Sequence, residues 1–220
     1  MDWPFDRAWP HIALKGFRDG PTYTDFSFDE LPPIPESQFV GTFNWLEESP
    51  LLDFGDDCDD ETPDPVAAIS LLDNDSATHG IKLPDAFRHF ITHVDLQRRI
   101  RSATACEFRF AERLIEITPH SGYIVPFLSD SQGCVHWNLF LTQKHQYCVV
   151  ASRYDYTWQT PADWEDDAPE HLRLTARTFE AFIYRFWIEN EIWFKTSRFF
   201  PDTLSSAQES YLEHYIDLET

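Results

Sequence analysis

The chain has 220 residues and a net charge of −21; 42% of its residues are hydrophobic, among them 19 Phe, 8 Trp and 8 Tyr. This length holds one good-sized domain, or one domain with an extension, and the aromatic residues suffice for a large core. The charge excludes nucleic acid and anionic membranes as partners, because both repel an acidic surface. It favours a basic protein as partner, and a surface that is acidic only for solubility is the alternative.

The acidic residues are concentrated in the first third of the chain. Between positions 19 and 81 there are 16 Asp or Glu and no Lys or Arg. We predict that residues 1–65 form an acidic N-terminal extension to a domain of residues 66–220, and it stays open whether they fold onto that domain. The acidic stretch 53–64, DFGDDCDDETPD, lacks the ligand spacing and the closing glutamate of an EF-hand. We predict neither a metal site nor a cofactor, and adventitious Ca²⁺ binding by this acidic stretch is the alternative.

The cysteines and the first residues indicate the compartment. Four cysteines stand at positions 58, 106, 134 and 148 without paired spacing, a pattern typical of reduced and mostly buried thiols. The start, MDWPFDRAWPHIALKG, has no apolar segment like that of a signal peptide, and no run of 18 apolar residues occurs. We therefore expect a cytoplasmic protein.

Two helices are predicted in the first half of the chain. Residues 66–72 form a short candidate, and Leu83-Pro84 opens a second helix, since a proline in the first turn loses no hydrogen bond. The buried stripe of this second helix follows the spacing i, i+3, i+4, i+7 and comprises Phe87, Phe90, Ile91 and Val94. Residues 107–118 alternate enough to predict strands.

The most regular pattern lies in residues 122–152, GYIVPFLSDSQGCVHWNLFLTQKHQYCVVAS. Apolar side chains recur there with the two-residue period of a half-buried strand, at Val135, Trp137, Leu139 and Leu141. Turn-forming residues at 129–133 and 143–146 interrupt the run. We predict a three-stranded antiparallel meander, with Trp137 in a core that also contains Phe87, Phe127 and Phe182.

Two further helices are predicted near the C-terminus. The first spans about residues 178–194, and its apolar face comprises Phe179, Phe182, Ile183, Phe186 and Trp193. The second starts at the capping-box spacing of Ser206 and Glu209 and carries Tyr211, Leu212, Tyr215 and Ile216. Helices before and after an antiparallel strand run predict an α+β fold, with a mixed, mainly antiparallel sheet and helices packed at both ends.

This order of elements resembles the SUKH superfamily, immunity-type proteins that include the fungal Smi/Knr-like cell-wall regulators. The resemblance covers about residues 66–200. The residues that carry it are Leu83, Pro84, Phe87, Phe90, Phe127, Leu128, Asp130, Trp137, Leu139, Val149, Val150, Ser152, Phe179 and Phe182. The family commonly has an Asn-Gly turn after its first helix, whereas this chain continues through ITHVDLQRRIRSATA.

The resemblance implies a SUKH-like sheet wrapped by helices, a protein-binding role and no catalysis. Bacterial members typically act as immunity proteins of polymorphic toxin systems: they bind and neutralise a cognate toxin, often a nuclease. Fungal relatives act as regulatory scaffolds. Toxin neutralisation, with a basic toxin domain as partner, is therefore the first expectation, and a regulatory scaffold is the second. A hydrolase that uses Cys134 and His136 is the alternative from a different class.

Three candidate groups have competing interpretations. Cys134 and His136 share a strand face, but such neighbours are about 7 Å apart, too far for a direct hydrogen bond, so we predict that Cys134 is a core thiol. His89 and His93 have metal-ligand spacing but lack the glutamate of H-E-x-x-H, and we predict exposed helix histidines. Asn190 interrupts an apolar stripe, which predicts a hydrogen bond to loop backbone, with a ligand contact as the alternative.

The partner-binding surface is predicted in the acidic loop of residues 155–170. Tryptophans surrounded by carboxylates are typical of an interface hot spot. The alternative is that the tryptophans cover the sheet while the acids face water. The predicted binding residues are Asp155, Trp158, Asp163, Trp164, Glu165, Asp166 and Asp167.

Overall fold

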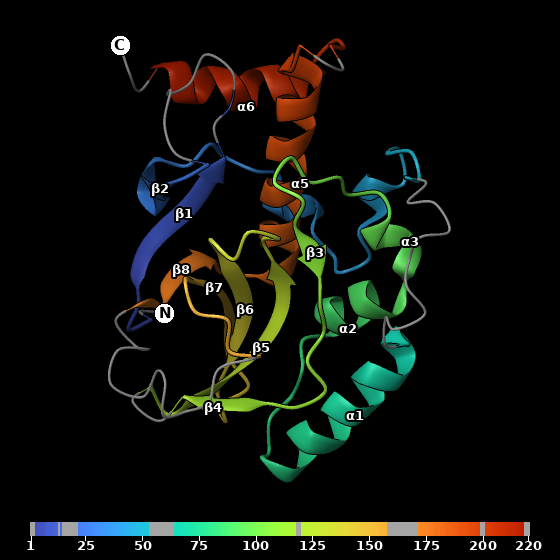
Figure 1. The fold of residues 1–220 in the computed structure, drawn as a ribbon, viewed down its shortest axis with the longest axis vertical. Helices are drawn as coiled ribbons and strands as arrows, with labels where there is room; N and C mark the ends of the chain where they lie inside the picture. The colour runs from blue at the N-terminus through green and yellow to red at the C-terminus, as the bar shows by residue number, and fades with distance from the viewer. Residues whose placement is uncertain are drawn as a thin grey trace.

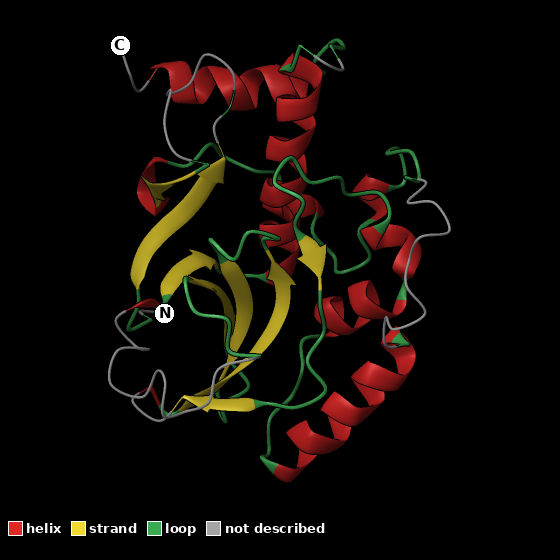
Figure 2. Ribbon diagram, viewed as in Figure 1, coloured by secondary structure: helices red, strands yellow, loops and turns green. Residues whose placement is uncertain are grey.

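The computed structural model of the protein contains one eight-stranded sheet with helices along one side and across one end (Figure 1). It describes residues 3–12, 14, 22–52, 64–117, 120–157, 171–198 and 201–217. The segregation of strands from helices is plain in Figure 2. The predicted α+β class with a mixed, mainly antiparallel sheet is confirmed. Among the described residues, no helix combines the length and the apolar character needed to cross a membrane.

The sheet has the strand order β2-β1-β8-β7-β6-β5-β3, and β4 pairs with β5. The β1–β8 pair is parallel, and the other described pairs are antiparallel. The strands are β1 (Asp6–Ile12), β2 (Tyr23–Ser27), β3 (Glu107–Phe108), β4 (Ile115–Ile117), β5 (Gly122–Ser129), β6 (His136–Leu141), β7 (Tyr147–Ser152) and β8 (Arg173–Ala176). The helices are α1 (Pro65–Thr78), α2 (Asp85–Thr92), α3 (Val94–Gln97), α5 (Phe179–Thr196) and α6 (Ser206–Asp217).

The predicted meander is confirmed, because β5, β6 and β7 pair antiparallel in sequence order. The expectation of a half-buried strand is wrong, since every residue of β6 is buried. One face of the sheet, with Trp137, packs in the main core. The other face, with Phe140, packs in a second apolar cluster that contains Phe5, Tyr156 and Leu172. Chain segments from before β1 and after β7 thus cover the face that was expected to be solvated.

Helix α2 begins where the proline predicts, directly after Pro84. Phe87, Phe90 and Ile91 are fully buried, as their spacing predicts. Val94 is 44% exposed, so its place in the buried stripe is wrong. The reason is that α2 ends at Thr92 and Val94 begins α3, which breaks the helical register.

Helix α5 supplies the centre of the main core. Thr178 caps it by accepting a hydrogen bond from the backbone of Ala181 at 3.2 Å. The ring of Phe182 lies 5.3 Å from that of Phe127 and 6.0 Å from that of Trp137. Phe127 also contacts Phe87, at 6.1 Å between ring centroids. The predicted aromatic core is therefore confirmed.

Helix α6 is confirmed, but its capping box lies one residue earlier than predicted. Ser205 Oγ accepts from the backbone of Gln208 at 3.4 Å, and Gln208 Oε1 accepts from the backbone of Ser205 at 3.0 Å. The predicted pair, Ser206 and Glu209, does not form it. Two consecutive serines each have a suitable residue three positions on, and burial of Gln208 selects the first pair.

The described parts of residues 1–65 belong to the same sheet and core as the rest of the chain. β1 pairs with β8, and Trp9, Phe43 and Leu46 are buried in the main core. The described parts of residues 1–65 thus fold onto the rest of the chain, a point that the sequence left open. Their aromatic side chains could not be assigned to it from sequence, because they follow no helical or strand period.

One buried carboxylate joins the two ends of the chain. Glu189 Oε1 accepts hydrogen bonds from Tyr211 at 2.9 Å and Tyr215 at 3.0 Å, both on α6. Glu189 Oε2 accepts from Trp9 Nε1 at 2.9 Å and lies 3.2 Å from His11 Nδ1, both on β1. Burial acts to raise the pKa of Glu189, but His11 and the hydrogen-bond donors outweigh it and hold this pKa below its ordinary value. Figure 1 shows the result, with α6 crossing the end of α5 close to β1 and β2.

We expect Trp137→Ala to lower the free energy of unfolding by roughly 3–5 kcal/mol, because it empties a fully enclosed aromatic site. Urea denaturation of the full chain measures this loss. Trp193→Ala, at a half-buried position on α5, serves as control and should cost less. Equal losses for the two variants would contradict the packing described for β6.

We expect Glu189→Gln to lower the free energy of unfolding at pH 7 by about 3 kcal/mol, because three donors lose a charged acceptor. The folded-state pKa lies below the unfolded one, so the ionised carboxylate stabilises the fold above about pH 4.3 and loses this effect as the pH falls further. The difference from the parent should therefore shrink in urea titrations below that pH. Glu213→Gln, on the exposed side of α6, is the control, and a constant difference down to pH 3 would refute this account.

Candidate functional site

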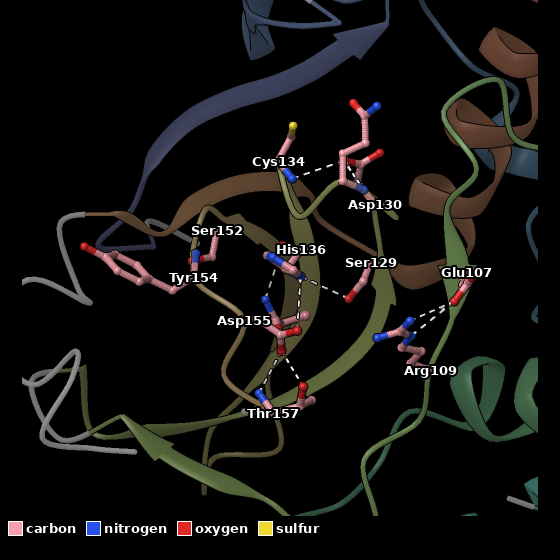
Figure 3. Close-up of polar contacts among 12 residues, drawn as sticks. Glu107, Arg109, Ser129, Asp130, Cys134, His136, Ser152, Tyr154, Asp155 and Thr157 are labelled. Atoms are coloured by element: carbon pink, nitrogen blue, oxygen red, sulfur yellow. Dashed lines mark hydrogen bonds and ion pairs between the residues drawn. The ribbon is translucent and has the colours of Figure 1, made fainter. Parts of the chain in front are cut away.

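Several side chains that the sequence singles out lie at the end of the meander where β5 and β7 end and β6 begins (Figure 3). The strand register places Ser129 and Ser152 on either side of His136. Asp155 follows β7 and approaches the same imidazole. The structure therefore brings a hydroxyl, an imidazole and a carboxylate together at one end of the meander.

Ser129 and Asp155 both approach the same side of the His136 imidazole. Its Nδ1 lies 3.0 Å from Ser129 Oγ and 3.9 Å from Asp155 Oδ2. Burial lowers the pKa of His136, and this outweighs the opposite effects of the Asp155 carboxylate and of a backbone hydrogen bond to Gly133. Burial therefore favours the neutral imidazole, and the contact with Ser129 orients the ring.

This grouping differs from a Ser-His-Asp catalytic triad in one decisive respect. In a triad the hydroxyl and the carboxylate bind opposite nitrogens of the imidazole, so that one nitrogen takes the proton while the other is oriented. Here Ser129 and Asp155 both face Nδ1 of His136. Ser129 is also buried. The arrangement orients the ring and leaves the serine unprepared for attack on a substrate.

Cys134 is exposed, so the prediction of a core thiol is wrong. It lies in the turn before β6, outside the strand on which the prediction placed it. Its backbone donates to Asp130 Oδ2 at 3.1 Å, and its sulfur points away from His136 (Figure 3). Desolvation and the Asp130 carboxylate both raise the pKa of the Cys134 thiol. The thiolate–imidazole pair that a cysteine hydrolase requires is not formed.

Asp155 is the one predicted binding residue within the described part of the chain. Its Oδ1 accepts a hydrogen bond from the backbone of Thr157 at 2.9 Å and another from the Thr157 hydroxyl. This is the geometry of an Asx turn, so the carboxylate shapes the start of the loop. The other predicted binding residues lie outside the described residues: Trp158, Asp163, Trp164, Glu165, Asp166 and Asp167.

His89 and His93 contact one another through their rings, 4.0 Å apart, and His93 Nδ1 lies 2.7 Å from the backbone oxygen of His89. His93 is exposed as predicted, but His89 is half-buried and stacks on Phe43. Burial and His93 lower the pKa of His89. In the part of the chain that the structure describes, no group of three or more His, Cys, Asp or Glu is placed to hold a metal ion.

The structural interpretation of Asn190 is confirmed. Its Oδ1 accepts from the backbone of Ala103 at 2.6 Å, and its Nδ2 donates to the backbone oxygen of Phe186 at 2.7 Å. The amide thus fixes the loop before β3 to α5. Both amide atoms are used inside the fold.

The sequence did not indicate the cleft at the start of α2. Its volume is about 620 Å³, and three separate segments line it. The lining residues are Val40, Gly41, Lys82, Leu83, Pro84, Asp85, Ala86, His89, His145 and Tyr147. Only the segment at 82–89 carried a sequence signal, the proline that opens the helix.

No family model, curated protein or solved structure matches this chain. The resemblance to the SUKH superfamily therefore rests on the residues alone and stays a prediction. For the choice between binding and catalysis, the structure offers the geometry and the pKa shifts of His136 and Cys134.

We expect Cys134 to react with iodoacetamide at pH 7 more slowly than free cysteine, because its pKa is raised and no imidazole activates it. Peptide mass spectrometry of the intact chain after timed labelling measures the rate at this site. Cys134→Ser identifies the signal. A rate above that of free cysteine would contradict this prediction and indicate that an imidazole activates the Cys134 thiol.

Proposed function

We propose that the chain is a non-enzymatic, cytoplasmic protein-binding module whose partner is a basic protein. Within the SUKH resemblance, this is an immunity protein that occludes a toxin domain, such as a nuclease, in a stoichiometric complex. A regulatory scaffold of the Smi/Knr type is the alternative that the same resemblance offers. A toxin gene beside the gene for this chain would favour the first role over the second.

The observation that carries the proposal is the acidic surface of residues 22–52. This segment has no Lys or Arg, and all its acidic residues are exposed: Asp25, Asp29, Glu30, Glu36, Glu47 and Glu48. Among the described residues, Glu36, Glu47 and Glu48 form no ion pair. These three carboxylates are therefore exposed to solvent without a direct ion-pair partner in the described part of the chain.

The way in which this segment is anchored keeps its carboxylates in solvent. Arg98 donates to the backbone oxygen of Leu52 at 3.2 Å, and Arg99 donates to that of Glu47 at 3.0 Å and to that of Ser49. The arginines next to the segment thus bind main-chain oxygens and not the side chains of Glu47 and Glu48. The anchor therefore holds no guanidinium group in a direct ion pair with these two carboxylates, although both cations lie beside them.

Such a surface mainly raises the rate of association with a basic partner. The field of the whole molecule, with its net charge of −21, attracts a basic protein over distances set by the Debye length. Charges at the rim of an interface change the association rate more than the dissociation rate. The closed hydrogen bonding at His136 and the raised pKa of Cys134 support binding over hydrolysis.

We expect Glu47→Gln/Glu48→Gln to slow association with the basic partner severalfold and to change dissociation less. The partner is first captured from the native host, and surface plasmon resonance at two salt concentrations then gives both rates. Glu209→Gln/Glu213→Gln is the matched control, with the same charge change on α6. A second variant that neutralises Asp163, Glu165, Asp166 and Asp167 tests the predicted loop in the same assay. An acidic partner, or an association rate that ignores salt, would remove the electrostatic basis of the proposal.

A further inference from the structure

Four aromatic rings form a cluster between α5 and the segment of residues 36–49. Tyr184 and Trp187 belong to α5, and Phe39 and Trp45 belong to the segment. The ring of Trp45 lies 5.0 Å from that of Tyr184 and 5.3 Å from that of Trp187. The ring of Phe39 lies 5.4 Å from that of Tyr184. Tyr184 is buried and the other three are half-buried, so the cluster presents aromatic surface to solvent.

The polar atoms of both indoles are already bound within the fold. Trp45 Nε1 donates to Glu180 Oε1 at 3.0 Å, and Trp187 Nε1 donates to Ser49 Oγ at 3.1 Å. Both acceptor residues are buried. Neither N–H group is left for a partner, so the two rings offer a partner their apolar and π surfaces. The π face of an aromatic ring attracts a cation, and tryptophan does so most strongly.

The backbone of the segment is fixed by several contacts. Gly41 donates to Glu180 Oε2 at 2.6 Å, and Arg99 donates to the backbone oxygen of Glu47 at 3.0 Å. Phe43 has a positive φ of 57°, which is unusual for a bulky residue, and its side chain is fully buried. Such strained backbone is concentrated at functional sites. A surface that is already ordered loses less entropy when a partner binds.

Exposed carboxylates flank the aromatic residues along the chain. Glu36 stands three positions before Phe39, and Glu47 and Glu48 stand two and three positions after Trp45. All three side chains are exposed, and none of them forms an ion pair with another described residue. An aromatic surface flanked by acids in this way is complementary to a cation that also has an apolar or planar surface.

The cations beside this surface do not reverse its charge. Arg98 lies 3.9 Å from the carboxylate of Asp95 and so has its own acidic neighbour. Arg99 has no ion pair among the described residues, and it is a single cation beside three exposed carboxylates. The buried carboxylate of Glu180, bound to Trp45, adds a further negative charge. Negative charge therefore predominates around the four rings.

We propose that this surface binds an arginine side chain of the basic partner, with its guanidinium stacked on Trp45 and Trp187 and its N–H groups directed at Glu47 and Glu48. A planar guanidinium covers a ring with its face while its edge donates to carboxylates, whereas the ammonium of lysine is compact and strongly hydrated. The chain itself contains such a stack, with the Arg101 guanidinium 4.3 Å from the ring centroid of Phe194. The inference rests on the proposed function and names the group of the partner that is recognised.

The test is a titration of the full chain with peptides, followed through the NMR signals of the tryptophan indole N–H groups at about 0.15 M salt. The probe is a capped peptide in which arginines alternate with glycines. Companion peptides have lysine, which keeps the charge, or citrulline, which keeps the shape without the charge. We expect saturable shifts of the Trp45 and Trp187 signals, and at least about threefold tighter binding of the arginine peptide than of the lysine peptide. The citrulline peptide should not bind.

Substitutions on α5 make the test specific. Trp187→Leu should weaken the arginine peptide at least about threefold, because it removes a π surface and keeps an apolar side chain. Trp187→Phe should restore part of the affinity, because it returns an aromatic ring. Trp193→Leu is the matched control, since Trp193 is half-buried on the same helix and its ring contacts Phe194, outside the cluster.

A second set of variants tests the acids without touching the aromatic packing. Glu47→Gln/Glu48→Gln changes two exposed side chains and should reduce the preference for arginine over lysine. Glu209→Gln/Glu213→Gln, on α6, is its control and should leave that preference unchanged. Thermal denaturation checks that every variant folds.

The proposal is overturned if the arginine and lysine peptides bind alike, or if the signals of Trp45 and Trp187 do not shift. It is also overturned if Trp187→Leu and Trp193→Leu bind the arginine peptide alike. These results need no captured partner, whereas the proposed function fails if the captured partner is acidic or associates at a rate that ignores salt. With a basic captured partner, Trp187→Leu should raise the dissociation rate severalfold and change association less, because an anchor in an interface acts on release. An unchanged dissociation rate would overturn the arginine site and leave the proposed function standing.

Discussion

The junction of the two ends of the chain depends on one buried carboxylate, because Glu189 is the point where the first strand and the last helix meet. Trp9 and His11 approach it from β1, and Tyr211 and Tyr215 approach it from α6. A charge in an aromatic core is tolerated only where hydrogen bonds and opposite charge replace the lost water. All of these partners must therefore be in place together, which couples the N-terminal strand to the C-terminal helix through α5.

Much of the secondary structure could be predicted from sequence, because burial repeats with a local period. The meander, α2, α5 and the core position of Trp137 follow from spacing alone, and Asn190 was predictable as a polar residue on an apolar stripe that must find a partner. The Glu189 cluster was not predictable. Its donors stand up to 180 positions away along the chain, and no local pattern relates Trp9 to Tyr215.

The prediction of the candidate site was wrong for the same reason, because it used only local spacing along the chain. Alternation along β6 indicated one buried face, whereas Phe5 and Tyr156 cover the other face from outside the meander. That cover buries His136 beside its hydrogen-bond partner Ser129. Cys134 falls in a turn, so its spacing from His136 carries no chemical meaning. Strand spacing alone gives the face of a side chain but not what packs against that face.

Helix α5 uses two buried carboxylates on opposite sides, and this explains how so acidic an N-terminal region can belong to the core. Glu180 and Glu189 are nine positions apart, which is two and a half turns of helix. Glu180 binds Gly41 and Trp45, while Glu189 binds β1 and α6. Neither contact uses an acidic side chain of residues 22–52. The aromatic and backbone groups of this region are thus bound inward while its carboxylates face water. The contacts of Glu180 and Glu189 that fold the N-terminal region therefore leave its carboxylates exposed to a partner.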